Sequence, residues 1–411
     1  MKFGGTSVAD LERMRRVARL VAAEAEAGHE VAVVVSAMAG RTNELVAWTD
    51  AAGEATAGAP ASDDEYDVVV ASGEQVSAGL VAMILRNMGL CARSWLGWQV
   101  PILTDDAHGK ARIEDVPPDK LLAALGAGEI PIVAGFQGVD RQGRLATLGR
   151  GAGDLSAVAV AAALKADRCD IYTDVDGVYT TDPRIEAKAR RLAKISYEEM
   201  LEMASLGARV LQGRSVELAM NQRVPLRVLS SFAEPGQSDN AGTIVCDEEE
   251  IVEKRVVSGV AYSRDEAKIS LFGLPDHPGV SSEIFGRLAD ANVNVDMIVQ
   301  SHARQAGAAN MEFTVGKRDA ARTMDIVTAA KGAIGFEDVA LDDNVAKVSV
   351  IGVGMRSHTG VAQTMFKALA ERGVNIQVIS TSEIKISVLI DVAYTELAVR
   401  ALHAAYGLDK I

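Results

Sequence analysis

The sequence predicts an α/β protein in which a three-layer α/β/α domain with a mainly parallel sheet precedes two ferredoxin-like domains of β-α-β-β-α-β order. Three observations support this class. Short apolar runs rich in Val and Ile alternate with helix-forming segments in the first part of the chain, which favours parallel strands joined by helices. Pro, Gly, Asn and a run of Glu in residues 232–255 indicate a domain boundary. Beyond this boundary the sequence repeats itself.

The first part of the chain supplies the strands and helices of the larger domain. Residues 29–38, "HEVAVVVSAM", are expected to contain a buried parallel strand, and "DVVVASGE" (67–74) and "IPIVAGFQG" (130–138) have the same pattern. Residues 11–28 have the periodicity of an amphipathic helix that ends at a glycine. Residues 156–166, "SAVAVAAALKA", are apolar almost all round and are expected to form a buried helix. Ligands of such sheets bind at the carboxyl ends of the strands.

The last part of the chain contains two copies of one pattern, beginning at Ala267 and Ala346. Each copy reads as a strand, a glycine turn, an amphipathic helix, a Val-Asn turn and a second strand, which is typical of the ferredoxin-like fold. Residues 51–67 have few large apolar side chains and are expected to be a surface excursion. The predicted boundaries are residues 1–245 for the larger domain, 246–262 for a linker, 263–341 for the first repeat and 342–411 for the second.

Composition argues against several classes of protein. A net charge of −14 repels nucleic acid and anionic membranes, so neither partner is expected. Cys91, Cys169 and Cys246 are far apart and form no CxxC pair, and no HExxH motif occurs, so no resident metal site is predicted. The sequence contains no secretory signal and no apolar run of membrane length. A cytoplasmic protein is the default expectation.

Glycine-rich corners follow several of the predicted strands. In "KFGGTSV", Gly4 and Gly5 allow backbone N–H groups to approach a phosphate, Ser7 adds a hydroxyl group and Lys2 adds a mobile cation. One such corner alone more often marks a simple turn. The chain has no GxxxxGK[ST] motif, so it is not a P-loop ATPase.

Three further corners carry charged or hydroxyl groups that suit an amino acid and a phosphoryl group. "ASGEQVS" places Glu74 just after a predicted strand, "MAGRTNEL" contributes Thr42, and "TLGRGAGDLS" contributes Arg150 and Asp154. An arginine binds a carboxylate with a bidentate fork, and a glutamate binds an ammonium group. Phosphoryl transfer needs mainly positioning and charge neutralisation, which Lys2 and Asp154 are suited to provide.

Together these motifs resemble the aspartate kinase family. They are "KFGGTSV", "VSAM", "GFQG", "TLGRG" with Asp154, "YTDVDGVYTTDPR" and "ARVLQGRSVELA", followed by "NVDMIVQ" and "STSEIKISVLI" in the repeats, and the resemblance covers essentially the whole chain. It implies an amino-acid-kinase fold for the first domain and ACT domains for the repeats. It also implies phosphorylation of the side-chain carboxylate of L-aspartate to 4-phospho-L-aspartate with ATP and Mg²⁺. This is the first step towards lysine, threonine and methionine.

The resemblance assigns roles to residues of this sequence. Lys2 and Asp154 match catalytic positions, and Thr42, Glu74 and Arg150 match the aspartate-binding set. The phosphate and nucleotide positions are matched by Gly4, Gly5, Ser7, Thr173, Asp174, Tyr179, Arg184 and Arg209. Arg209 stands where the family usually has lysine, so the cation is kept but its point-charge geometry is not.

The ACT repeats of this family bind lysine, threonine or both as feedback inhibitors. The corresponding effector positions are Asp276, Asp296 and Gln300 in the first repeat and Met355, Ser357, His358 and Ser382 in the second. Thr359 replaces a usual proline, and Gln377 stands where Glu is common. The resemblance also implies a homo-oligomer that is paired through the ACT repeats.

The sequence departs from the family at two places. The corner usually reads G-R-G-G-S-D-T, but here Ala152, Gly153 and Leu155 replace a glycine, a substrate-binding serine and a threonine. Losing one hydroxyl contact to a charged substrate would cost about 1.5–3 kcal/mol of binding. In addition, only Met1 precedes Lys2, where relatives have several apolar residues of a central strand. A misassigned start or a shortened chain is expected, and lower stability follows if the start is genuine.

Three functions remain open from the sequence. The first is an active aspartate kinase under feedback control. The second is a catalytically weak paralogue that serves as an amino-acid-sensing regulatory subunit, which the altered corner and the short start favour. The third is a kinase for another acidic amino acid that uses the space left by Gly153.

Overall fold

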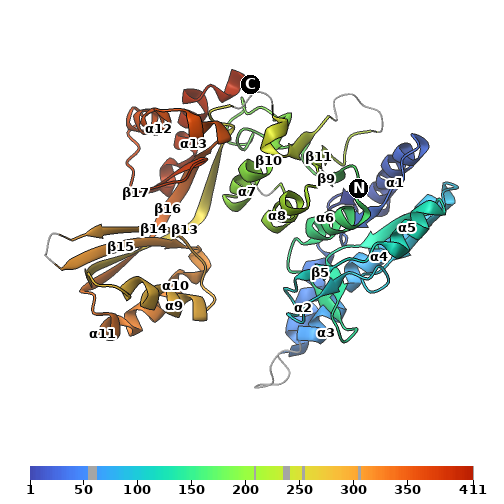
Figure 1. Ribbon diagram of the computed structural model, residues 1–411, viewed down its shortest axis with the longest axis horizontal. Coiled ribbons are helices and arrows are strands. Elements are labelled where there is room, and N and C mark those ends of the chain that lie inside the picture. Colours follow the sequence, from blue (N-terminus) through green and yellow to red (C-terminus); the bar gives the residue numbers. More distant parts are fainter. Residues whose placement is uncertain (54–62, 208–209, 235–240, 252–254, 304–306, 411) are drawn as a thin grey trace. The chain divides into compact units, whose positions relative to one another are not determined.

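The computed structural model describes residues 1–53, 63–207, 210–234, 241–251, 255–303 and 307–410. Contacts between residues divide the chain into two compact units (Figure 1). The first unit comprises Met1–Val178, Arg191–Ala204 and Arg209–Val252, and the second comprises Tyr179–Arg190, Ser205–Ala208 and Glu253–Ile411. Residues 179–190 therefore belong with the C-terminal unit, although the sequence prediction placed them inside the larger domain.

The first unit is built on an eight-stranded sheet with the strand order β10-β12-β11-β9-β1-β2-β6-β3. Its neighbouring strands run parallel except for β11 and β12. The mainly parallel sheet predicted from the sequence is therefore confirmed. The strands are β1 (Lys2–Phe3), β2 (Val33–Val35), β3 (Ala92–Trp95), β6 (Ile130–Ala134), β9 (Cys169–Thr173), β10 (Lys194–Ser196), β11 (Leu226–Ser230) and β12 (Thr243–Cys246).

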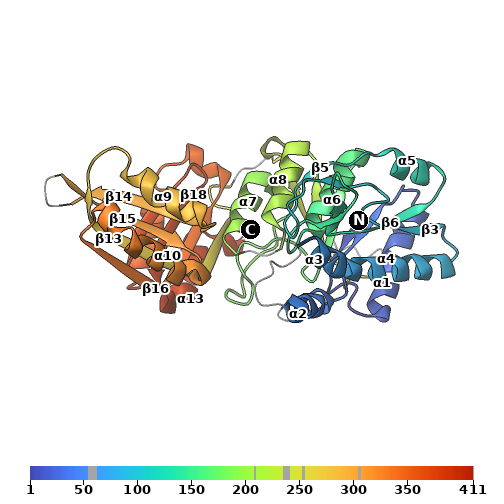
Figure 2. The ribbon, with the colours of Figure 1, turned by 90° about the horizontal axis from the view of Figure 1, so that it is seen from below.

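Helices cover both faces of this sheet, which gives the predicted three layers. Phe3 packs into one apolar cluster with residues of α1 and α4, whereas α6 lies against β1, β2 and β9. Successive residues of a strand point to opposite faces, so Lys2 faces α6. Figure 2 shows α5, α6 and α8 on one side and α1 and α4 on the other. The helices are α1 (Leu11–Glu26), α4 (Ser72–Asn87), α5 (Asp119–Gly126), α6 (Gly153–Leu164), α7 (Tyr197–Ser205) and α8 (Gly213–Gln222).

A second, smaller sheet of order β5-β4-β7-β8 lies in the same unit. Its strands β7 and β8 form an antiparallel hairpin that leads directly into the corner before α6. Helix α3 packs against β8. These elements are α2 (Arg41–Gly53), α3 (Asp63–Val70), β4 (Leu103–Thr104), β5 (Ile113–Asp115), β7 (Gln137–Val139) and β8 (Leu145–Thr147).

The structure corrects one predicted strand. "DVVVASGE" is not a strand: residues 67–70 form the end of α3, and α4 starts at Ser72. A short β-branched run between polar residues fits a buried helix as well as a buried strand, and periodicity alone does not distinguish them. Among the described residues, the helical run Asp63–Asn87 is also long and apolar enough to span a bilayer by length and composition. Half of its most apolar window is buried inside the protein, which core helices also show.

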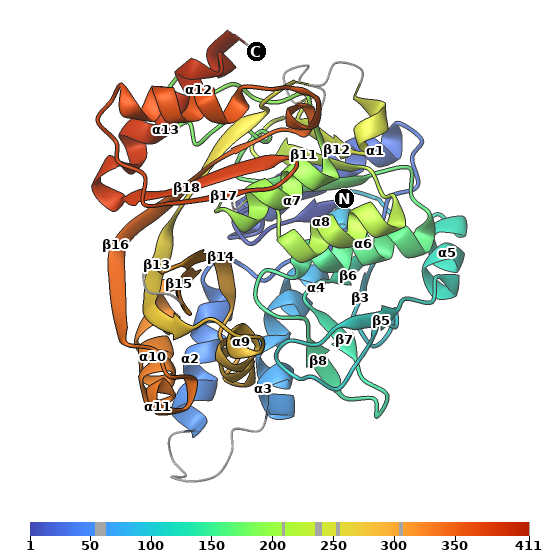
Figure 3. The same cartoon turned by 60° about the vertical axis from the view of Figure 1, so that its left-hand side comes forward.

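The second unit contains one six-stranded sheet of order β14-β15-β13-β16-β18-β17. Its long strands β13 and β16 pair along most of their length (Figure 3), and their two halves serve different repeats. The strands are β13 (Gly259–Pro275), β14 (Val295–His302), β15 (Ala308–Val315), β16 (Asp338–Ile351), β17 (Val378–Thr381) and β18 (Lys385–Asp391). The helices are α9 (Val280–Asp290), α10 (Lys317–Ala329), α11 (Lys331–Ile334), α12 (Val361–Ala370) and α13 (Thr395–Ala405).

Each repeat completes a ferredoxin-like sheet, but the second repeat takes one strand from an unexpected place. Residues 259–263 pair with residues 347–351 and supply the fourth strand of the second repeat. Four of these five residues, 259–262, lie inside the segment predicted as a linker. The linker prediction of 246–262 therefore needs correction at its end, since the second repeat encloses the first.

The segment 179–190 is attached to the second repeat by buried hydrogen bonds. The Val260 N–H group donates to the Thr180 carbonyl oxygen (2.8 Å), and the Thr180 hydroxyl group lies 2.9 Å from Nε2 of His403 in α13. Burial lowers the pKa of His403, so its neutral form is favoured in this contact.

A cavity of about 630 Å³ adjoins Met1 at the amino end of β1. Residues of β9, of the segment before β2, and of α5 and α6 line it. The Met1 amino group donates to the Ala32 carbonyl oxygen (2.8 Å) at its edge.

Candidate active site

An ion pair between Lys2 and Asp154 lies at the centre of the first unit. The ammonium group of Lys2, on β1, is 2.6 Å from Oδ1 of Asp154 in the first turn of α6, and both side chains are 11% exposed. Oδ2 of Asp154 accepts a hydrogen bond from the Gln212 backbone N–H group (3.3 Å). The structure therefore brings together the two residues predicted to act on the transferred group. Asp154 holds the ammonium group at the carboxyl end of a central strand.

The glycine corner after β1 is tightly packed. A Cβ atom on Gly5 would lie 2.9 Å from the Ala37 carbonyl oxygen, and one on Gly4 would lie 3.4 Å from Nζ of Lys2. Gly5 therefore leaves no room for a side chain, and Gly4 borders the cation. The hydroxyl group of Ser7 is buried and has no hydrogen-bond partner among the described residues. A buried hydroxyl without a partner costs free energy, and a bound phosphate oxygen would supply the missing partner.

Glu74 is a buried carboxylate with one free oxygen. Glu74 lies in the first turn of α4 and is 4% exposed, and its Oε1 atom accepts a hydrogen bond from the Ala37 backbone N–H group (3.0 Å). Oε2 has no hydrogen-bond partner among the described residues. Burial raises the pKa of Glu74 to about 7, and backbone hydrogen bonds oppose that effect. The free oxygen suits an incoming ammonium group, which would also stabilise the ionised form.

The corner between β8 and α6 explains the departures from the family sequence. Gly149 and Gly151 have φ angles of 86° and 83°, which favour glycine, whereas Ala152 has a φ of −74° and is unstrained. Leu155 is buried in an apolar cluster, so it packs in the core. A Cβ atom on Gly153 would lie 2.8 Å from Oγ of Ser36 and 3.2 Å from Cε of Lys2. Ser36 and Lys2 therefore occupy the space beside Gly153.

Arg150 and Thr42 lie on elements that border this corner. Arg150 is exposed, and its carbonyl oxygen accepts a hydrogen bond from the side chain of Gln212 (3.3 Å). Thr42 is in the first turn of α2, and the same helix contacts Gly73 at the start of α4 through the Leu45 side chain. The structure thus places the predicted substrate residues on three neighbouring elements, α2, α4 and the β8–α6 corner.

The predicted nucleotide residues are divided between the two units. Thr173 ends β9, and its hydroxyl group donates to the exposed carboxylate of Asp174 (3.1 Å) in the first unit. Tyr179 and Arg184 belong to the second unit. Arg184 is largely exposed and pairs with Asp182 (2.8 Å), which lowers the pKa of that carboxyl group. Arg209 lies outside the described residues.

Two predicted effector residues of the first repeat line one cavity. This cavity has a volume of about 360 Å³ and includes Asp276, Ser281 and Gln300 in its wall. The Ser281 hydroxyl group donates to Oε1 of Gln300 (3.3 Å), and Asp276 lies 3.3 Å from the His302 ring. The structure thus brings Asp276 and Gln300 together around a hollow large enough for an amino acid.

Asp296 has a different environment. It forms an ion pair with Lys347 of the second repeat, and Lys347 also lies 2.7 Å from Glu266. Burial opposes the charge of Lys347, but the two carboxylates outweigh burial and raise the pKa. In the matching pair, the Lys268 ammonium group donates to Oε1 of Gln377 (2.7 Å). Asp296 therefore helps to join the two repeats and does not line the cavity of Asp276.

The predicted effector residues of the second repeat lie on two adjacent turns. Met355 and Ser357 belong to a 3₁₀ segment, Val353–Ser357, and Nδ1 of His358 lies 2.8 Å from the Gly354 carbonyl oxygen. Ser382 lies in the turn between β17 and β18. The Gly352 N–H group donates to the Ile384 carbonyl oxygen (2.9 Å), so these turns are joined.

Sequence reasoning missed residues that shape the active site through the backbone. Arg214 of α8 donates to the carbonyl oxygens of Leu148 (2.7 Å) and Ala111 (3.2 Å), and Gln212 contacts both Asp154 and Arg150. Both lie in the quoted motif "ARVLQGRSVELA", whose side chains carried no chemical signal alone. Among the described residues, no group of three or more His, Cys, Asp or Glu side chains is arranged to hold a metal ion.

The comparisons with known proteins agree with this geometry. Residues 1–230 match the model of the amino acid kinase family, and residues 269–332 and 348–406 each match an ACT domain.

Curated relatives match along nearly the whole chain. The aspartokinase of Pseudomonas aeruginosa is 52% identical over 410 residues, which cover 99% of this chain and 97% of that protein. The aspartokinase of Mycolicibacterium smegmatis is 47% identical over 411 residues, covering 99% and 95%. Aspartokinase III of E. coli, solved in complex with aspartate and ADP, superposes with a TM-score of 0.80 at 29% identity and 98% coverage of both chains. The chain therefore belongs to the aspartate kinase family.

Proposed function

We propose that this chain transfers the γ-phosphoryl group of ATP to the side-chain carboxylate of L-aspartate, forming 4-phospho-L-aspartate and ADP. The observation that carries this proposal is the ion pair between Lys2 and Asp154 beside the Gly4–Gly5 corner. A carboxylate oxygen of aspartate attacks the γ-phosphorus, and the bond to the β,γ-bridging oxygen breaks. Lys2 neutralises charge on the transferring group, and Asp154 holds Lys2 in position.

Substrate recognition uses the remaining groups of the active site. Glu74 accepts the α-ammonium group of aspartate on its free Oε2 atom, and Arg150 binds the α-carboxylate with its fork of N–H donors. Thr42 supplies a hydroxyl group from α2. The solved complex of E. coli aspartokinase III with aspartate and ADP supports this substrate and a nucleotide.

The nucleotide is placed by backbone and hydroxyl groups. Gly4, Gly5 and Ser7 form the phosphate corner, and this role is supported by the Ser7 hydroxyl group, which has no partner in the parts of the chain that the structure describes. Thr173 and Asp174 lie at the end of β9, and we propose that they contact the nucleotide. The proposed nucleotide roles of Tyr179, Arg184 and Arg209 depend on the family resemblance of their motifs alone. Mg²⁺ bound with the nucleotide would neutralise phosphate charge, and it commonly takes most of its ligands from phosphates and water.

We further propose that lysine or threonine regulates the enzyme through the ACT repeats. The cavity with Asp276 and Gln300 offers a carboxylate and an amide to an amino acid. E. coli aspartokinase III has been solved with lysine and aspartate, which supports effector binding. Met355, Ser357, His358 and Ser382 form the proposed second effector region, and Asp296 acts by joining the repeats. A homo-oligomer paired through these repeats and a cytoplasmic location complete the proposal.

The two other functions gain less support. A kinase for another acidic amino acid would use the space beside Gly153, but Ser36 and Lys2 fill that space. A weak regulatory paralogue would not need the intact pair of Lys2 and Asp154.

A coupled assay with ATP, Mg²⁺ and L-aspartate tests the proposal, with L-glutamate as the alternative acceptor. We expect turnover with aspartate, a large loss in Lys2→Met, and inhibition by lysine or threonine that Asp276→Ala relieves. If the full-length protein shows no turnover while effectors still raise its Tm, the regulatory paralogue is correct. If only glutamate is phosphorylated, the third function is correct.

A further inference from the structure

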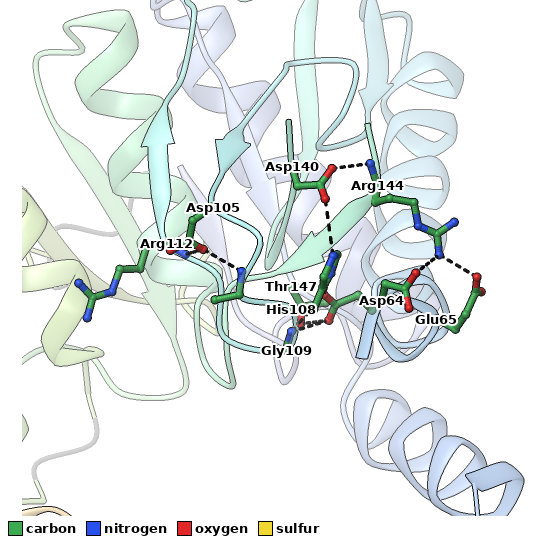
Figure 4. Close-up of polar contacts among 11 residues, drawn as sticks. Asp64, Glu65, Asp105, His108, Gly109, Arg112, Asp140, Arg144 and Thr147 are labelled. Atoms are coloured by element: carbon green, nitrogen blue, oxygen red, sulfur yellow. Dashed lines mark hydrogen bonds and ion pairs between the residues drawn. The ribbon is translucent and has the colours of Figure 1, made fainter. Parts of the chain in front are cut away.

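A buried carboxylate outside the active site is held by three different donors. Asp67 of α3 is fully buried. It accepts hydrogen bonds from the Gly109 backbone N–H group (3.1 Å), the Thr147 hydroxyl group and Nδ1 of His108 (2.8 Å). Figure 4 shows His108, Gly109 and Thr147 close together. We call these four residues the Asp67 clamp.

The clamp is supported from behind by the turn that carries His108. Asp105 accepts the backbone N–H groups of Ala107 (3.3 Å) and Arg112 (2.9 Å) and so closes that turn. Nε2 of His108 lies 3.6 Å from Asp140, at the start of the β7–β8 turn. His108 therefore lies between two carboxylates from different elements, and its position is defined on both sides.

The clamp connects the two elements that carry the proposed substrate groups. Thr147 ends β8, directly before the corner with Arg150, while α3 continues through Ala71 into α4 and Glu74. The Gln137 side chain of β7 donates to the Ala71 carbonyl oxygen (2.9 Å) and supports the same junction.

A second contact between these elements is exposed and makes a useful comparison. Arg144 of the same hairpin pairs with Asp64 (2.8 Å) and Glu65 (2.7 Å) of α3. Exposed ion pairs tolerate movement and contribute little. Removing one donor from a buried carboxylate, in contrast, costs more free energy, because no water replaces the lost hydrogen bond. The clamp is therefore the buried polar contact between α3 and the corner, and it lies beside an apolar cluster that Val70 shares with Leu148 and Ala152.

We propose that the Asp67 clamp is a positioning cluster for aspartate, which keeps Arg150 and Glu74 at the separation that the α-carboxylate and α-ammonium groups require. This inference rests on the proposed function. The residue before Asp67 provides a second contact: Tyr66 packs against the apolar cluster that contains Ala152 and Leu155, so α3 also touches the start of α6. The clamp residues touch neither substrate in this arrangement and act through Arg150 and Glu74.

Thr147→Val tests the clamp, because it keeps the side-chain shape and removes the hydroxyl donor. Loss of alignment by a fraction of an ångström weakens a two-point contact. We expect KM for aspartate to rise by about tenfold, with KM for ATP changed by less than about twofold. Thr147→Ser, which keeps the hydroxyl group, should retain the wild-type KM for aspartate. Arg144→Ala removes the exposed contact and is the matched control, with both KM values unchanged.

Amide hydrogen exchange of residues 148–156 gives a readout that does not depend on substrate. We expect faster exchange there in Thr147→Val than in Thr147→Ser or Arg144→Ala, and Asp67→Asn should behave like Thr147→Val. Equal increases in both KM values, a failure of Thr147→Ser to retain the wild-type KM, or unchanged exchange would overturn the clamp. A wild-type protein without aspartate turnover would instead overturn the proposed function, and the exchange measurement would still decide on the clamp.

Discussion

The buried carboxyl group of Glu74 predicts a pH dependence of aspartate capture. Glu74 is 4% exposed, and burial raises its pKa to about 7. Only the ionised form pairs with the α-ammonium group of the substrate. As the pH falls below about 7, a growing fraction of the free enzyme carries a neutral Glu74. We therefore expect kcat/KM for aspartate to fall about tenfold per pH unit below this pKa and to level off above it.

The same pKa increase affects the stability of the first unit. The folded state binds this proton more tightly than the unfolded chain, whose glutamate has its ordinary pKa of 4.5. The stabilising contribution is thus fully present below pH 4.5 and is lost as the pH rises to about 7. One pKa unit corresponds to about 1.4 kcal/mol, so the loss amounts to about 3 kcal/mol above pH 7. Glu74→Gln keeps the oxygen that accepts the Ala37 N–H group and removes the titration.

Two measurements check this reasoning. A pH profile of kcat/KM for aspartate in the wild type should bend near pH 7, and Glu74→Gln should show a low value without that bend. Urea unfolding at pH 8 should give a higher midpoint for Glu74→Gln than for the wild type, and the difference should shrink towards pH 5. A wild-type profile that is flat from pH 5 to 8 would refute the raised pKa. A Glu74→Gln variant that unfolds more easily at pH 8 would refute the burial cost.

Three further predictions concern the corner around α6. Lys2→Met should lower kcat about 100-fold or more, because a charge that stabilises the transferring group is lost. Asp154→Asn should lower kcat by a smaller factor. Equal kcat values in the wild type and Lys2→Met would contradict the role of Lys2. Gly153→Ser should lose about 1 kcal/mol of stability by crowding Ser36, whose Oγ atom lies 2.8 Å from the new Cβ position. Adding Ser36→Ala to this variant should restore the stability measured by urea unfolding. A Gly153→Ser protein as stable as the wild type would show that the space is open. Leu155→Thr should lose about 2–3 kcal/mol in the same assay, because Leu155 is 5% exposed in the core, with Leu155→Ile as the milder control, and an unchanged midpoint would contradict its packing.

The order of motifs and the internal repeat predicted the family and the parallel sheet, and they singled out Lys2 and Asp154, which the structure brings into contact. Lys2 and Asp154 are far apart in the chain, yet both were identified because glycine corners at strand ends converge at one edge of a parallel sheet. The helices predicted at residues 11–28 and 156–166 are present as α1 (Leu11–Glu26) and α6 (Gly153–Leu164), because a regular apolar pattern is a local property of the sequence.

Other features could not be predicted, because they depend on partners far away in the chain. "DVVV" is helical because α3 packs on β8. A short apolar run in the sequence does not reveal which element it packs against. Residues 259–262 were predicted to be part of a linker, but residues 259–263 complete the sheet of the second repeat. Which strands pair depends on how distant segments pack together. The roles of Asp67 and His108 could not be predicted from the sequence. An aspartate that is buried and hydrogen-bonded is the same residue type as one that is exposed to solvent.

The sequence by itself therefore determined which chemical groups the protein possesses and the fold that holds them, because both follow from local residue patterns and from the order of the motifs along the chain. Only the tertiary structure decided how those groups are used. Ser36 lies against Gly153, Asp296 pairs with Lys347, and one oxygen of Glu74 has no hydrogen-bond partner within the described part of the chain. The physical reason is that burial and distance set the energy of polar groups, and both arise only when distant segments pack together.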